Sequence, residues 1–241
     1  MSGARLHTLL PELTSRQPVM VVGAAVIDVI ADAYALPWRG CDIELKQQSV
    51  NVGGCALNIA VALKRLGIEA GNALPLGQGV WAEIIRNRMA KEGLISLIDN
   101  AEGDNGWCLA RIMACRPLVS LNRQEAEIAA ERFALSAEIT TLGEQWQEKF
   151  AAPLIVRLDK EGAWYFSNDA SGCIPAFPTQ VVDTIGAGDS HAGGVLAGLA
   201  SGLPLADAVL QGNAVASWVV GHRGGDCAPT REELLLAHKN V

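Results

Sequence analysis

Three consecutive small residues stand directly before a helix in the last third of the chain, within the segment Asp183-Thr-Ile-Gly-Ala-Gly-Asp-Ser-His-Ala-Gly-Gly194. Because Gly186, Ala187 and Gly188 carry at most a methyl group, main-chain amides can close around an anion at the positive end of the helix dipole. The segment follows a strand that ends at Val182. It therefore predicts a strand, a tight turn and a helix that together form a phosphate cradle.

Asp189 lies in the same turn. A carboxylate beside an anion is costly unless it has a task such as accepting a proton. A purely structural explanation is also open, in which Asp189 caps the helix and the glycines only form a tight turn. Two other phosphate motifs are excluded by spacing, since the chain has neither GxxxxGK[ST] nor a complete GxGxxG.

The rest of the chain predicts an α/β fold. The β-branched run Pro18 to Val29 has no helical period and predicts a buried strand of a mostly parallel sheet, with Asp28 near its carboxyl end. The more polar segment Cys41 to Val50 predicts an exposed strand that belongs to a small lid. Asn51 to Asn58 is a glycine turn that leads into a helix. The 25 glycines and the low aromatic content of 5% suit close packing of helices on a sheet.

Further elements follow from periodicity and from turn residues. The predicted strands are 95–98, 115–121, 154–158 and 163–166. The predicted helices are 82–92, 142–150, 189–200, 205–220 and 231–238, with a further helix that follows Asn122-Arg-Gln-Glu125. No linker or repeat interrupts the pattern, so residues 1–241 are expected to form a single domain.

Charge and cysteine content exclude several classes of function. A net charge of -7 gives no basic footprint for nucleic acid or for an anionic membrane. The six cysteines show no CxxC pair and no metal-ligand spacing, which favours reduced thiols over a disulfide scaffold or a zinc site. The apolar run Val19 to Ile27 is too short to span a bilayer and lacks the layout of a signal peptide, so a cytoplasmic protein is expected.

Five pieces of the chain, taken in order, resemble the PfkB-type carbohydrate kinases, the ribokinase-like family. These pieces are Gly23 to Asp28, Gly53 to Asn58, Asn122 to Glu125, the turn up to Gly162, and Asp183 to Gly194. Each is weak alone, but the order and the closing DTxGAGD are specific. The resemblance implies a doubly wound, mostly parallel sheet flanked by helices, with a small β-lid. It also implies transfer of the γ-phosphoryl group of ATP to a hydroxyl of a sugar or nucleoside.

The resemblance assigns roles residue by residue. Asp189 would accept the proton of the acceptor hydroxyl, and the amides of Gly186, Ala187 and Gly188 would form the anion hole. The residues that would hold the sugar are Asp28, Gly53, Gly54 and Asn58. The residues that would contact the nucleotide are Asn122, Gly162, Asn213 and Gly225. The residues that would bind metals are Glu125 for Mg2+, directly or through water, and Asp183 with the carbonyl of Ile185 for a monovalent cation such as K+.

Plainer interpretations of these residues stay open beside the family. Asp28 also suits a strand-end cap, Asn58 a helix surface, and Glu125 a solvated helix face. His191 follows Asp189 by two residues and has no partner at metal spacing, so we expect it to be a surface or packing residue.

The chain departs from the family in two places. Arg157-Leu-Asp159 stands where a Thr-x-Gly is usual, which leaves the nucleotide contacts of that loop undefined. The interval between Asn58 and Leu121 is also too short, because it would have to hold lid strands and at least one βαβ unit of about 30 residues. The sequence therefore predicts a deletion near 107–112, with the remaining lid strands within 34–50 and 95–110.

This shortening leaves two functions open. One is an ATP- and Mg-dependent sugar kinase, and the other is an impaired remnant that binds nucleotide or sugar or serves as an interaction module. Lids of this family often pair between two subunits, which would make a homodimer, and the polar strand Asp42 to Val50 suits such an edge. The shortened lid weighs against a stable dimer.

Overall fold

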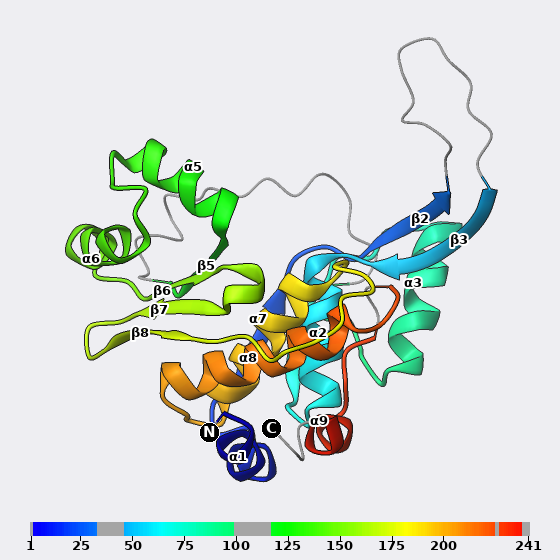
Figure 1. Cartoon of the computed structure of the whole chain (residues 1–241). Coiled ribbons are helices and arrows are strands. Elements are labelled where there is room, and N and C mark those ends of the chain that lie inside the picture. Colours follow the sequence, from blue (N-terminus) through cyan, green and yellow to red (C-terminus); the bar gives the residue numbers. More distant parts are fainter. Residues whose placement is uncertain (1, 33–45, 99–116, 225–226, 238–241) are drawn as a thin grey trace.

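The computed structural model describes residues 2–32, 46–98, 117–224 and 227–237 (Figure 1). Its helices are α1 (Ser2–Leu9), α2 (Cys55–Arg65), α3 (Val80–Lys91), α5 (Arg123–Phe133), α6 (Ile139–Phe150), α7 (Ala187–Ala200), α8 (Leu205–Val220) and α9 (Arg231–Ala237). Its strands are β1 (Val19–Val22), β2 (Val26–Asp32), β3 (Lys46–Gly53), β4 (Ala70–Ala73), β5 (Val119–Asn122), β6 (Leu154–Arg157), β7 (Ala163–Phe166) and β8 (Ser171–Ile174). Short 3-10 turns occupy Leu10–Glu12 and Asp159–Glu161.

The predicted α/β class is confirmed, but the sheet is divided. Within the described residues, β1 pairs in parallel with β4, β2 pairs antiparallel with β3, and a third sheet has the order β5-β6-β7-β8. In the third sheet only β5 and β6 are parallel. The predicted strand at Ile95 to Ile98 forms only an isolated parallel bridge, between Asn72 and Ser96. The single mostly parallel sheet is therefore not found in the described part of the chain.

The expectation of one long buried strand over Pro18 to Val29 is wrong. The run is divided at Gly23, which has φ 154 and where a Cβ would stand 2.8 Å from the Cβ of Ala56. After this turn the chain leaves the β1–β4 sheet and enters the β2–β3 hairpin, which projects from the body of the molecule (Figure 1). Asp28 consequently lies inside this antiparallel hairpin, opposite Asn51, and not at the carboxyl end of a core strand. A run of β-branched residues predicts extended backbone but does not say which sheet receives it.

Small residues allow α7 to pack closely between α2 and α8. A Cβ at Gly193 would lie 2.6 Å from the Cβ of Ala62 in α2, and a Cβ at Gly194 would lie 2.9 Å from the Cα of Gly212 in α8. Larger side chains there would push the helices apart, because interiors pack at crystal-like density. This contact brings the first turns of α7 and α2 to the same region of the molecule.

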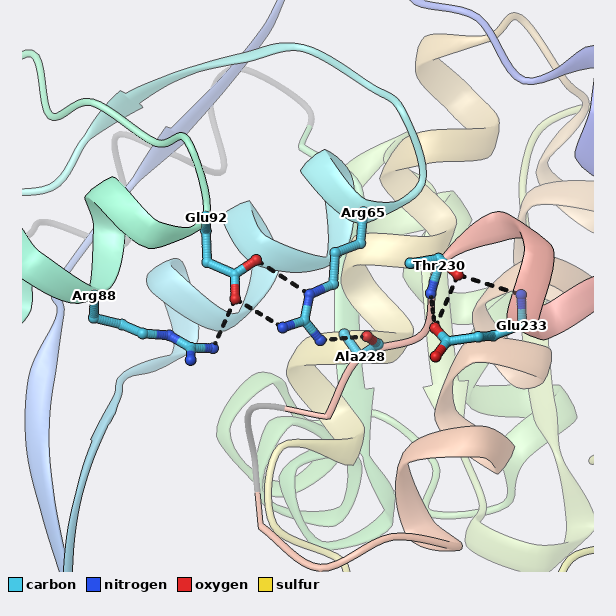
Figure 2. Close-up of polar contacts among 6 residues, drawn as sticks. All are labelled: Arg65, Arg88, Glu92, Ala228, Thr230 and Glu233. Carbon is cyan, nitrogen blue, oxygen red and sulfur yellow. Dashed lines mark hydrogen bonds and ion pairs between the residues drawn. The ribbon is translucent and has the colours of Figure 1, made fainter.

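A cluster of charged groups joins the ends of α2 and α3 to the segment before α9 (Figure 2). The guanidinium of Arg65 donates to both carboxylate oxygens of Glu92, at 3.2 and 2.7 Å, and to the carbonyl of Ala228 at 2.6 Å. Arg88 adds a second ion pair to Glu92 at 3.1 Å. Burial alone would raise the pKa of Glu92, but the hydrogen bond and charge of Arg65 outweigh it and lower that pKa. The cluster stabilises the fold away from the first turn of α7.

One side of β1 is uncovered among the described residues. Val21 is buried in the main core, whereas its neighbours Met20 and Val22 are 60% and 50% exposed. Ile95 and Leu97, which follow α3, are 79% and 63% exposed. In a doubly wound fold both faces of such a sheet are covered by helices. The part of the chain that the structure describes contains no element that covers this side.

Two further expectations concern residues outside the description or only partly inside it. Of the lid segment predicted at 34–50, only residues 46–50 are described, and they belong to β3. Residues 33–45 lie outside the described residues. Of the segment predicted at 95–110, only residues 95–98 are described. No helix among the described residues has the length and apolar character needed to cross a bilayer.

Candidate active site

The first turn of α7 has the form of an anion site. Gly186 is the N-cap residue and adopts a left-handed conformation with φ 76, which glycine tolerates without strain. The amide of Ala187 makes a long bond of 3.3 Å to the carbonyl of Thr184. Within the described part of the chain, the amides of Gly188 and Asp189 donate to no backbone carbonyl. Two amides at the positive end of the helix are thus without a backbone acceptor, and one of them, that of Gly188, belongs to the predicted anion hole of Gly186, Ala187 and Gly188. Binding of an anion there stays a prediction.

Asp189 and Asn58 are brought together from distant parts of the sequence. The side-chain amide of Asn58, in α2, donates a 3.0 Å hydrogen bond to the carboxylate of Asp189. Cys55, in the first turn of α2, lies close enough that Asp189 affects its thiol. Burial raises the pKa of Cys55, and the hydrogen bond and charge of Asp189 raise it further. The predicted proton acceptor and one predicted sugar ligand therefore share one site.

Gly53 and Gly54 connect the β2–β3 hairpin to α2. Gly53 is the last residue of β3 and pairs with Val26. Gly54 has φ 101 and caps α2, and a Cβ there would lie 2.7 Å from the carbonyl oxygen of Ala24. A side chain at residue 54 would close the approach between the hairpin and the helix, which explains the need for glycine at this position.

Asn122 and Glu125 form a capping box at the start of α5. The side chain of Asn122 accepts from the amide of Glu125 at 2.8 Å, and the carboxylate of Glu125 accepts from the amide of Asn122 at 2.7 Å. Both residues are exposed at the carboxyl end of β5. The motif thus has a clear structural use, to satisfy the first amides of the helix. One carboxylate oxygen of Glu125 is also 3.5 Å from the guanidinium of Arg157.

Arg157 is a residue whose position the sequence did not reveal. It ends β6, directly beside Asn122 of β5 in the parallel register. Its guanidinium occupies the space that a side chain at residue 188 would need, so it lies against the first turn of α7. The only signal in the sequence was the departure from the usual family pattern at this position. The contact of Arg157 with Gly188 could not be predicted, because it depends on how β6 and α7 lie beside each other in the folded protein.

Gly162 closes the turn after β6. It has φ 98, and a Cβ there would overlap the carbonyl of Ile174, which makes glycine necessary. Its carbonyl accepts from the amide of Leu158 at 2.8 Å. Asp159, which stands in this turn, also has a positive φ of 52. The predicted turn at Asp159 to Gly162 is present, while a contact between Gly162 and a nucleotide stays a prediction.

The residues predicted to bind a monovalent cation lie together. The carboxylate of Asp183 accepts from the amide of Ile185 at 3.0 Å and from the amide of Gly224 at 3.0 Å. These two backbone hydrogen bonds lower the pKa of Asp183. The carboxylate thereby joins the turn before α7 to the loop after α8. Gly225, predicted to contact the nucleotide, lies outside the described residues.

Asn213 is buried in α8 and bonded within the protein. Its side-chain amide donates to the carbonyls of Ile174 and Pro175, at 2.9 and 3.2 Å. Its oxygen lies 3.2 Å from the Nε2 atom of His191, which is 3% exposed in α7. The structure therefore gives Asn213 a packing role between α7, α8 and the end of β8. His191 is the packing residue of the two expected alternatives, not a surface residue.

His191 should make folding stability sensitive to acid. Burial, with a smaller effect of the charge on Arg157, lowers its pKa from 6.5 to about 3. Between these two pH values the unfolded chain binds a proton that the folded chain does not, so stability falls as pH falls below about 6.5. We expect His191→Gln, which keeps a donor for Asn213, to reduce the loss of unfolding free energy between pH 7 and pH 5 by about 2 kcal/mol. Urea unfolding at both pH values measures this difference.

The matched control for this measurement is His222→Gln, since His222 is exposed after the end of α8. We expect this control to keep the acid sensitivity of the parent chain. The same pH dependence in the parent chain and in His191→Gln would contradict the assignment.

No group of three or more His, Cys, Asp or Glu side chains suited to a metal ion occurs among the described residues. The side chain of Glu125, the residue predicted to bind Mg2+, is 50% exposed.

The site thus combines a glycine-capped helix, two amides without a backbone acceptor and a carboxylate in the first turn, within an α/β fold. The sequence profile of the pfkB family of carbohydrate kinases matches residues 16–114 and 108–231. The chain belongs to this family. The two matched segments overlap at residues 108–114, next to the predicted deletion.

A close relative and two solved structures agree with this membership. The uncharacterized sugar kinase YegV of Escherichia coli (strain K12) is 74% identical over 321 positions, covering 100% of both chains. The ribokinase of Thermotoga maritima has a TM-score of 0.76 at 19% identity and covers 92% of this chain and 99% of its own. The fructokinase of Xylella fastidiosa with bound ATP has a TM-score of 0.71 at 16% identity and covers 93% and 99%. These structural matches establish the ribokinase-like fold.

The alignment with the Escherichia coli relative contains long gaps. Its 321 positions outnumber the 241 residues of this chain by 80, so at least that many positions have no counterpart here.

Proposed function

We propose that the chain phosphorylates a hydroxyl group of a sugar or nucleoside with ATP as the donor. The observation that carries this proposal is the contact of Asn58 with Asp189 beside the free amides of the first α7 turn. A proton acceptor, a group able to hold a polyol, and an anion site thus meet in one place. Phosphoryl transfer needs chiefly this alignment and charge neutralisation.

In the proposed reaction, the acceptor oxygen forms a bond to the γ-phosphorus of ATP while the bond from that phosphorus to the β-γ bridging oxygen breaks. The hydroxyl proton passes to the carboxylate of Asp189, and ADP leaves. The amides of Gly188 and Asp189 hold the phosphoryl oxygens as negative charge builds up. Asn58 orients the carboxylate of Asp189 through the 3.0 Å hydrogen bond and donates to the sugar as it enters.

The metal assignments extend the same proposal. Mg2+, when bound with ATP, neutralises the phosphate charge, and Glu125 would hold it directly or through water beside Asn122. Asp183 and the carbonyl of Ile185 would form the monovalent-cation site. The grouping of Asp183, Ile185 and Gly224 through two backbone hydrogen bonds supports the second site.

The acceptor class is a pentose, a hexose or a nucleoside with a primary hydroxyl. A carboxylate and amide pair suits adjacent hydroxyl groups, which present both donors and acceptors. The relative from Escherichia coli carries the name of a sugar kinase, which favours sugars. An assay that couples ADP release to a panel of sugars and nucleosides tests the proposal. Phosphorylation of at least one such hydroxyl is expected, and phosphorylation only of a carboxylate or an amine would contradict it.

The second candidate function is an impaired remnant that binds nucleotide or sugar without turnover. Three observations favour it: the 80 unmatched positions, the overlap of the two profile matches at 108–114, and the uncovered side of β1. Of the three, the overlap of the profile matches falls at the predicted deletion near 107–112, and the motifs on either side are intact. No turnover with any acceptor, together with measurable ATP binding, would favour this second function over the first.

A further inference from the structure

Arg157 lies where no family motif predicts a cation. It is the last residue of β6, and its guanidinium lies against Gly188 in the first turn of α7. The guanidinium fills the space beside Gly188, so that any larger residue at position 188 would displace it. Gly188 and Arg157 are therefore complementary in shape. A phosphate cradle alone does not require an arginine beside this glycine.

The partners of Arg157 hold it only loosely. Its one ion pair among the described residues is with Glu125, at 3.5 Å, whereas a charge-assisted hydrogen bond is about 2.7–2.9 Å long. Its Nε atom is buried and has no hydrogen-bond partner within the described part of the chain. The side chain is 22% exposed, while that of Glu125 is 50% exposed. A mostly buried guanidinium thus keeps unused donor capacity, which is costly unless a further acceptor binds there.

The charge of Arg157 reaches the residues around the site. It opposes the rise in the pKa of Cys55 and contributes to the fall in the pKa of His191, both of which flank Asp189 in the structure. The guanidinium itself lies beside Gly188, the residue before Asp189 in the first turn of α7.

We infer that Arg157 binds the terminal phosphate of the nucleotide. This rests on the proposed function. The group that would face both the free amides of α7 and the acceptor is the phosphoryl group in transfer, and Arg157 lies against Gly188, which carries one of those amides. The planar fork of a guanidinium matches the spacing of two phosphate oxygens. Glu125 holds the fork in position before the nucleotide arrives.

The test compares nucleotide binding with and without the terminal phosphate. Calorimetry is run with a non-hydrolysable ATP analogue and with ADP, on the parent chain and on Arg157→Gln. We expect the substitution to weaken binding of the ATP analogue by on the order of 10- to 100-fold, with ADP binding changed less than about threefold. The matched control is Arg123→Gln, which breaks a more exposed ion pair, between Arg123 and Glu161 at 2.7 Å. The control should bind both nucleotides as the parent does.

Arg157→Lys separates charge from geometry. It keeps the positive charge beside Glu125 but not the fork, so we expect a smaller loss of the preference for the ATP analogue. This variant decides the matter if Arg157→Gln fails to fold. Equal weakening of the ATP analogue and ADP, or no weakening of either, in a folded Arg157 variant would overturn the inference alone. A parent chain that binds neither nucleotide would overturn the inference together with the proposed function.

Discussion

Asp189→Asn should lower turnover of the best acceptor by on the order of 1,000-fold, because loss of a positioned general base typically costs a factor of 100 to 10,000. Asparagine has the same shape and can still bond to Asn58, so the α2–α7 contact should persist. Affinity for the ATP analogue should change little. The measurement is the rate of ADP release, accompanied by calorimetry on the same preparation.

Asp169→Asn is the control for this substitution, because Asp169 is exposed in the turn between β7 and β8, far along the chain from the first turn of α7. Its turnover should equal that of the parent. If Asp189→Asn retained the parent rate, the proton acceptor would have to be another group. Because Gly186 and not Asp189 is the N-cap residue of α7, the carboxylate would then serve only the contact with Asn58 between α2 and α7.

The second large effect concerns the shortened segment. Asp28 and Asn58 precede the predicted deletion at 107–112, whereas Glu125 and Asp189 follow it, so the acceptor side and most of the nucleotide side come from different parts of the chain. We expect the chain to retain binding of the ATP analogue better than binding of sugars, which calorimetry with both ligands measures. A misplacement of about 1 Å at the reacting atoms can cost on the order of 100-fold in rate.

Inserting the corresponding segment of the Escherichia coli relative should therefore raise turnover by at least about 100-fold. The insertion should also cover the exposed side of β1, where Met20 and Val22 lie, and so raise the thermal unfolding temperature. An inserted segment of equal length with scrambled sequence is the control, and it should restore neither property. Tight sugar binding by the present chain without nucleotide binding would contradict the argument, as would unchanged turnover after the insertion.

The sequence alone was sufficient for the parts of the site that depend on local backbone. Gly186, Ala187 and Gly188 predicted a tight turn that leads into a helix, and α7 begins there with Gly186 as its N-cap residue. Free amides follow from the helix start itself, whereas binding of an anion to them stays a prediction. The spacing of Asn122 and Glu125 likewise places both in the first turn of one helix, where they form a capping box. The family could also be recognised from the sequence, because its motifs are short, local and in a fixed order.

The division of the first β-branched run was decided by the tertiary structure. At Gly23 the chain turns out of the first sheet and into a second one. Only glycine fits at this turn, because a side chain there would meet Ala56 of α2. That obstacle comes from a residue on another element, so no pattern within Pro18 to Val29 could predict it. Asp28 was misplaced for the same reason.

The surroundings of Asp189 also depend partly on the sequence and partly on the tertiary structure. The residue and its task could be proposed from the chain, but its partner Asn58 and its neighbour Cys55 depend on how α2 packs against α7. The reach of Arg157 to Gly188 depends on how β6 lies beside α7. Sequence determines backbone preference and the chemistry of each side chain within a few residues. Which side chains meet across the molecule is decided by close packing. A single added Cβ atom that would stand less than 3 Å from an atom of another element is enough to exclude a packing arrangement.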